Sequence, residues 1–160
     1  MAALISTPVR TRRTRSRASI LAGLLLTFGC AMALNGCTLP GGNATSCHGF
    51  AQCQPVIDQA AFSAGANAQL MINIAWAESC DNSDANNGSH FGLYQYSTAT
   101  YDGEVAQVAP YAYGTTPFNS AASSYVTAEV LNHGGLGNWA ASAHGGCDGH
   151  GWADGYNAPW

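Results

Sequence analysis

One glutamate is placed where acid–base chemistry could occur. Glu78 ends a segment, residues 69–78, in which Met71, Ala75 and Glu78 recur at helical spacing and share one otherwise apolar stripe. Burial beside apolar neighbours raises the pKa of a carboxyl, and a carboxyl that stays protonated at about pH 6–7 can serve as a general acid. The spacing therefore predicts that Glu78 is catalytic. The alternative is a solvated carboxylate at a helix end, with no chemical role.

Two short motifs around Glu78 resemble those of a known group of enzymes. Ala77-Glu78-Ser79, followed after a polar loop by Gly92-Leu93-Tyr94-Gln95, resembles the Glu-Ser … Gly-Leu-x-Gln signature of lytic transglycosylases related to goose-type lysozyme. The chain from Asn67 to Cys147 also resembles the resuscitation-promoting factors of actinobacteria. The counterparts of their late Gln-Gly…Trp…Cys features are His133-Gly134, Trp139 and Cys147.

This resemblance implies a lysozyme-like fold and cleavage of peptidoglycan glycan strands. Glu78 would protonate the glycosidic oxygen between N-acetylmuramic acid and N-acetylglucosamine, and would then accept a proton from the sugar's 6-hydroxyl, which gives a 1,6-anhydro product. The substrate's acetamido group could assist, so this scheme departs from the usual pair of carboxylates. The residues expected to bind the substrate are Ser79, Gly92, Tyr94, Gln95 and Tyr96.

Three alternatives to this reaction stay open. If water were the acceptor, the enzyme would be a lysozyme-type hydrolase with a second carboxylate about 6.5–9.5 Å from Glu78. Two rivals have no such chemistry: a non-catalytic wall-binding lipoprotein, and a small metal-binding lipoprotein that uses the spacing His144-x-x-Cys147-x-x-His150. We expect Cys147 in a disulfide, so we predict no metal and no cofactor. The candidates for the second carboxylate are Asp81 and Asp84, expected in a solvated loop, Asp102, expected in an Asp-Gly turn, and Glu104.

The N-terminal part of the chain has the pattern of an export signal. All five arginines lie within residues 10–17, and an apolar run follows over residues 20–34. That run is short for a permanent membrane helix, which needs about 20 apolar residues. Leu34-Asn35-Gly36-Cys37 resembles a bacterial lipobox, so we expect Cys37 to be lipidated. Because Asn35 is unusual in a lipobox, plain secretion is the alternative to an anchor in the cell envelope.

The charge of the exported part excludes several classes of partner. All five basic residues lie before Cys37 and all nine acidic residues lie after it. Removal of the signal therefore leaves a formal charge of −9 with histidine neutral. Such a surface repels phosphate, so nucleic-acid binding is not expected, whereas a glycan strand is an acceptable partner. We expect the surplus of acid to raise the pKa of Glu78 further. We also expect a monomer that meets the membrane only through the lipid anchor.

Four cysteines follow Cys37, and in an exported chain they predict two disulfides. Three pairings are possible, of which we favour Cys47–Cys53 and Cys80–Cys147. A disulfide likewise joins the catalytic segment to the C-terminal end in the resuscitation-promoting factors. Closing the longer loop would contribute about 4 kcal/mol in the chain-entropy model.

The pattern of the whole chain predicts one mostly helical domain. We expect a signal in residues 1–36, a tether with a small cysteine loop in 37–54, and a compact lysozyme-like catalytic domain in 55–160. Alternation typical of strands is weak throughout. The expected helices are residues 55–64, a helix capped by Asn67 that ends at Glu78, one capped by Asn119 or Ser120 that ends near Gly134, and a brief one over 139–143.

Overall fold

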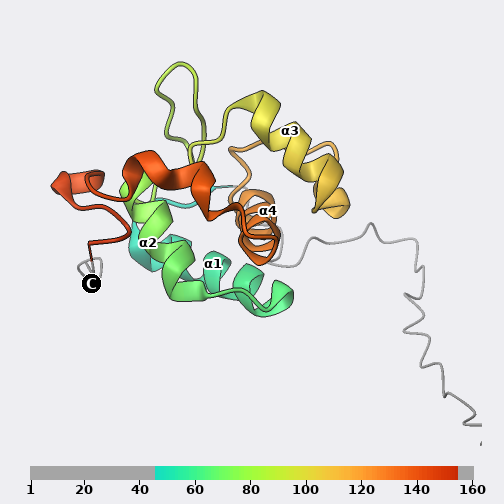
Figure 1. Ribbon diagram of the computed structural model, residues 1–160, viewed down its shortest axis with the longest axis horizontal. Coiled ribbons are helices and arrows are strands. Elements are labelled where there is room, and N and C mark those ends of the chain that lie inside the picture. Colours follow the sequence, from blue (N-terminus) through green and yellow to red (C-terminus); the bar gives the residue numbers. More distant parts are fainter. Residues whose placement is uncertain (1–45, 155–160) are drawn as a thin grey trace, which may run out of the picture. The chain divides into compact units, whose positions relative to one another are not determined.

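The computed structural model describes residues 46–154 (Figure 1). The predicted signal, Cys37 and the first half of the predicted tether and cysteine loop, residues 37–45, therefore lie outside the described residues. Within residues 46–154 the chain is helical, with isolated β-bridges in place of strands, which confirms the mostly helical class. None of the helices in this range is long and apolar enough to span a membrane. The elements are α1 (Phe50–Ala64), α2 (Ala68–Ser79), α3 (Thr98–Gln107), η1 (Pro110–Ala112), α4 (Ser120–Asn132), η2 (Gly135–Ser142) and η3 (Cys147–Gly149).

The central helix of the domain is α4, and the other elements pack around it. It contacts α1, α2, α3, η1 and η2. The Asn119 side chain accepts a hydrogen bond from the Ala122 amide, which confirms the predicted cap. Almost the whole of α4 is buried, because small residues let its neighbours approach from several sides. Its buried polar residues are Ser120, Ser123, Ser124 and Thr127.

Helix α1 begins at Phe50, five residues before the expected start at Pro55. Gly49, with a φ of 70°, precedes the helix, and its carbonyl oxygen accepts a hydrogen bond from the Cys53 amide. The disulfide Cys47–Cys53 holds this first turn. The sequence alone indicated a later start because proline is most often found in the first turn of a helix. The expected end is confirmed, since Gly65 is left-handed with a φ of 71°.

Helix α2 begins as predicted and packs against α1. The Asn67 side chain accepts a hydrogen bond from the Leu70 amide. The helix extends one residue beyond Glu78, to Ser79, and the chain then turns sharply because Cys80 and Asp81 both have positive φ, 53° and 55°.

Helix α3 was not predicted. The chain runs as a helix through Asp102-Gly103, where a turn was expected. The side chain of Ser97 caps the helix by accepting a hydrogen bond from the Thr100 amide. Tyr101 and Val105, one turn apart, are buried against the core. The cap and this buried face together outweigh the turn preference of the Asp-Gly pair.

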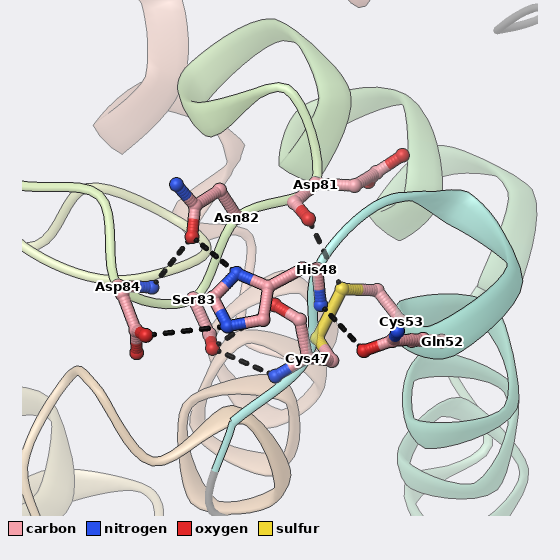
Figure 2. Close-up of polar contacts among 8 residues, drawn as sticks. All are labelled: Cys47, His48, Gln52, Cys53, Asp81, Asn82, Ser83 and Asp84. Atoms are coloured by element: carbon pink, nitrogen blue, oxygen red, sulfur yellow. Dashed lines mark hydrogen bonds and ion pairs between the residues drawn. A yellow bond between two sulfur atoms is a disulfide. The ribbon is translucent and has the colours of Figure 1, made fainter.

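The segment before α1 is part of the folded domain, because it pairs with the loop that follows α2 (Figure 2). The Gly49 amide donates to the Asp81 carbonyl oxygen at 2.7 Å, and residues 47 and 83 exchange backbone and side-chain hydrogen bonds. The ring of His48 lies between Asn82, at 3.0 Å, and Asp84, at 3.3 Å. Two stretches far apart in sequence thus fix each other directly after the helix that carries Glu78.

Asp81 is buried, contrary to the expectation of a solvated loop residue. Its side chain has no exposed surface, and neither carboxyl oxygen has a hydrogen-bond partner among the described residues. Figure 2 shows the side chain pointing away from the polar contacts of His48. Because burial disfavours the charged form, the pKa of Asp81 rises from 3.8 to about 6.

This burial predicts a pH-dependent cost. The folded state binds the Asp81 proton more tightly than the unfolded state does. The contribution of this proton to the free energy of unfolding is therefore fully present below a pH of about 3.8 and is lost as the pH rises through about 6. Asp81→Asn should therefore raise the free energy of unfolding by about 2–3 kcal/mol at about pH 8, and by little at about pH 3.5. Urea unfolding of the oxidised protein at both pH values measures this. Asp58→Asn, on the exposed face of α1, should change neither value, and an equal effect of Asp81→Asn at both pH values would contradict the burial argument.

Candidate active site

Glu78 lies in the last turn of α2 with its side chain partly buried. The Ser142 hydroxyl donates a hydrogen bond of 2.5 Å to Glu78 Oε1. Burial raises the pKa of Glu78, while the Ser142 hydrogen bond and the charge of His90 act in the opposite direction. The net shift is upward, in the direction that a general acid requires.

Ser142 comes from η2, which is held against the end of α2. The disulfide Cys80–Cys147 joins the residue after α2 to the start of η3, five residues after Ser142, with a Cα–Cα distance of 5.3 Å. With Cys47–Cys53 it confirms both favoured pairings. Gly146 packs directly on α2, where a Cβ atom would run into the Ala77 backbone. Sequence reasoning missed Ser142, and the signal that could have found it is its position between Trp139 and the disulfide cysteine.

His90 is the second group that sequence reasoning missed. It lies in the exposed loop after α2, where bridges join Phe91 to Asn86 and to Tyr96. The Asn87 side chain accepts a hydrogen bond from the His90 amide, and the His90 ring contacts Ser89. The charge of His90 lowers the pKa of Glu78, so this loop contributes to the electrostatic environment of the carboxyl.

Ser79 and Gln95 connect the loop to the helix end. The Ser79 hydroxyl lies 2.8 Å from the Leu93 carbonyl oxygen and 3.0 Å from that of Ala75, and it accepts a hydrogen bond from the Asn82 amide. The hydrogen bonds of Ser79 thus hold the backbone of the Gly92–Gln95 segment. The Gln95 amide group donates to the carbonyl oxygens of Gly92 and Ala85, at 2.9 and 3.3 Å. For both residues, contact with the substrate stays a prediction.

Tyr94 and Tyr96 are core residues, which corrects the expectation that their side chains contact the substrate. They are 0% and 3% exposed. Their hydroxyls bond to Ser124 and Thr127 of α4, and Trp139 donates its indole N–H to the Tyr94 carbonyl oxygen. Their buried side chains therefore anchor the Gly92–Gln95 segment to α4. The expectation was wrong because an aromatic side chain beside a functional motif suits the core as well as a sugar cleft.

Three of the four candidates for the second carboxylate are enclosed or engaged elsewhere: Asp81 is buried, Asp84 pairs with His48, and Glu104 accepts a hydrogen bond from Asn138. The fourth, Asp102, lies on α3 and is exposed. The charge that acts on Glu78 is that of His90, which lowers its pKa. The expected rise through burial is therefore present, whereas the further rise expected from like-charge repulsion is not.

The spacing His144-x-x-Cys147-x-x-His150 does not form a metal site, because the Cys147 sulfur is bonded to Cys80. His144 instead contacts Asp154 at 2.5 Å. Among residues 46–154 no group of three potential ligands is arranged to hold a metal ion.

No family model matches this chain, and no curated protein matches it.

Removal of the Ser142 hydrogen bond should change the pKa of Glu78. Ser142→Ala removes a donor that favours the charged form, so the pKa of Glu78 should rise. Carbon-detected NMR titration of the Glu78 carboxyl measures the change, with Ser63→Ala on the exposed face of α1 as the control. An unchanged titration in Ser142→Ala would contradict the hydrogen bond.

Gly92 is packed so closely that even an added methyl group should destabilise the protein. Gly92 has a φ of 77°, and a Cβ atom there would run into the Pro117 carbonyl group. Gly88, with a φ of 94°, has open space around its Cα. Gly92→Ala should lower the free energy of unfolding by about 3 kcal/mol or more, since overpacking adds to the conformational strain, whereas Gly88→Ala should cost about 1–2 kcal/mol. Equal losses in urea unfolding would show that packing against Pro117 does not matter.

Proposed function

We propose that this protein cleaves peptidoglycan glycan strands, with Glu78 as its single general acid and base. The observation that carries the proposal is the state of that carboxyl: partly buried, with a raised pKa, and held by the Ser142 hydroxyl. Asp81 also has a raised pKa, but it is enclosed and has no hydrogen-bond partner among the described residues, whereas Glu78 is only partly buried and is held by a donor.

In the proposed reaction Glu78 first donates its proton to the glycosidic oxygen between N-acetylmuramic acid and N-acetylglucosamine. The bond to the leaving sugar breaks, and the muramic acid 2-acetamido oxygen stabilises the positive carbon. Glu78, now a carboxylate, takes the proton of the 6-hydroxyl as that oxygen bonds to the carbon. The product is a 1,6-anhydro sugar, and Glu78 ends protonated as it began. Ser142 would hold Glu78 in place most firmly between the two steps, when Glu78 is a carboxylate, since its hydroxyl donates best to the charged form.

The positions of the other carboxylates favour this lyase route over hydrolysis. A hydrolase that inverts its substrate needs a second carboxylate to activate water. Asp81 is enclosed by protein, and Asp84 and Glu104 are engaged with His48 and Asn138. Asp102, on α3, is exposed, and the charge that acts on Glu78 is that of His90 and not of a carboxylate. A mechanism in which the substrate supplies its own nucleophile needs no second carboxylate.

The test compares purified peptidoglycan digested with the oxidised protein and with Glu78→Gln, and identifies the soluble products by mass. We expect 1,6-anhydro ends from the wild type and a loss of at least about 10³-fold in rate with Glu78→Gln, because the residue is both acid and base. Glu129→Gln is the matched control, a partly buried glutamate on α4. It should retain activity.

Other products would redirect or end the proposal. Hydrated reducing ends would make the protein a lysozyme-type hydrolase and would overturn the lyase step. If the wild type bound the wall and released no product, the non-catalytic wall-binding alternative would replace the enzyme. Full activity in Glu78→Gln would remove Glu78 from the mechanism.

A further inference from the structure

A hollow that belongs to none of the features above lies beside α3. It has a volume of about 410 Å³, within the range of about 300–1,000 Å³ typical of small-molecule sites. Figure 1 shows α3 apart from α1 and α2, with α4 between them in that view. Glu78, Ser142 and His90 come from α2, η2 and the loop before Gly92, and none of them lines the hollow. Its lining residues are Asp102, Val105, Ala112, Tyr113, Gly114 and Thr115.

The wall of the hollow is held rigidly without using the groups that could meet a ligand. The Thr115 hydroxyl lies 2.8 Å from the Tyr101 hydroxyl and donates to the Ala112 carbonyl oxygen at 2.6 Å. The backbone between residues 109 and 115 makes three further hydrogen bonds. A site held in advance loses less conformational entropy when a ligand binds.

Two exposed side chains give the hollow its chemistry. Tyr113 is 86% exposed, which is a large aromatic surface to leave in water. Asp102 is also exposed and accepts hydrogen bonds with both of its oxygens when it is ionised. Buried Val105 and Ala112 supply an apolar floor. An aromatic face, a carboxylate and an apolar floor suit a sugar ring, which has apolar C–H faces and a rim of hydroxyl donors.

We propose that this hollow is a second glycan-binding site, which takes one N-acetylglucosamine unit of a strand with the sugar stacked on Tyr113 and its hydroxyls donating to Asp102. The identity of the ligand rests on the proposed function. Asp102 selects between the two wall sugars at this hollow. Its carboxylate repels the carboxylates of the peptide that muramic acid carries and accepts hydrogen bonds from the hydroxyls of the neutral sugar.

A second site on the same domain serves binding to a polymer. Once one part of a strand is held beside α3, other parts of it reach the Glu78 region at a raised effective concentration. The site therefore matters for long strands and little for short soluble fragments.

The test is an NMR titration of the Glu78→Gln protein, which cannot turn the ligand over, with the β-1,4-linked tetramer of N-acetylglucosamine. We expect the backbone amides of the lining residues to shift. Tyr113→Ala in the same background should weaken this binding about two- to tenfold, the equivalent of losing one aromatic contact. Asp102→Asn should weaken it as well. Tyr111→Ala is the matched control, a neighbouring tyrosine that is 72% exposed and does not line the hollow; it should bind like the parent.

The outcomes separate this inference from the proposed function. Shifts confined to residues outside the hollow, or equal binding by Tyr113→Ala and Tyr111→Ala, would overturn the second site even if the wild type digests peptidoglycan. Shifts in the hollow that depend on Tyr113 would support it even if the wild type releases no product, in which case the chain binds glycan through this site without cleaving it.

Discussion

The structure depends on how the end of α2 is held. Directly after Ser79, two consecutive residues other than glycine, Cys80 and Asp81, adopt left-handed φ values, a conformation that costs roughly 1–2 kcal/mol for each such residue. The neighbouring segments keep the chain in this turn. The Gly49 amide bonds to the Asp81 carbonyl oxygen on one side, and the disulfide to Cys147 fixes Cys80 on the other. Strain of this kind persists where the surrounding structure over-determines it.

The same turn accounts for the chemical environment of Glu78. It stops α2 with Glu78 in its last turn, and it sends the chain into the loop that carries His90. The disulfide brings η2 back over the helix end, so that Ser142 meets the carboxyl. Burial raises the pKa of Glu78, and the two groups delivered by these segments limit the rise. The described part of the chain contains no lysine or arginine. The pKa of Glu78 is therefore set by its burial, by the Ser142 hydrogen bond and by the charge of His90.

The sequence predicted those features whose cause is local. Asn67 and Asn119 cap their helices because a short side chain there reaches an amide three residues later. The central place of α4 was hidden, since a helix buried on all sides through alanine and serine has no apolar stripe to recognise. Helix α3 was missed because its evidence is the packing of Tyr101 and Val105, which outweighs a local turn preference.

Within the site, the prediction extended as far as the motifs did. The partial burial of Glu78 could be predicted from its stripe, whereas Ser142 lies 64 residues away and meets Glu78 only through tertiary structure. The burial of Asp81, Tyr94 and Tyr96 is likewise a tertiary result, which composition cannot distinguish from exposure in a cleft.

The disulfide Cys80–Cys147 also sets the conditions in which the site is complete. It closes a separation of 67 residues, and such a cross-link removes about 4 kcal/mol of chain entropy from the unfolded state in the loop-closure model. Ser142 lies five residues before Cys147, on a segment with little regular structure beyond 3₁₀ turns. In a reducing compartment this segment would be held only by its packing on α2 and α4 and by hydrogen bonds such as that from Trp139 to the Tyr94 carbonyl oxygen. If the chain is exported as its N-terminal pattern predicts, the disulfide forms only after the chain has left the cytoplasm. The Ser142–Glu78 hydrogen bond would then reach its full stability outside the cytoplasm, where the proposed substrate lies.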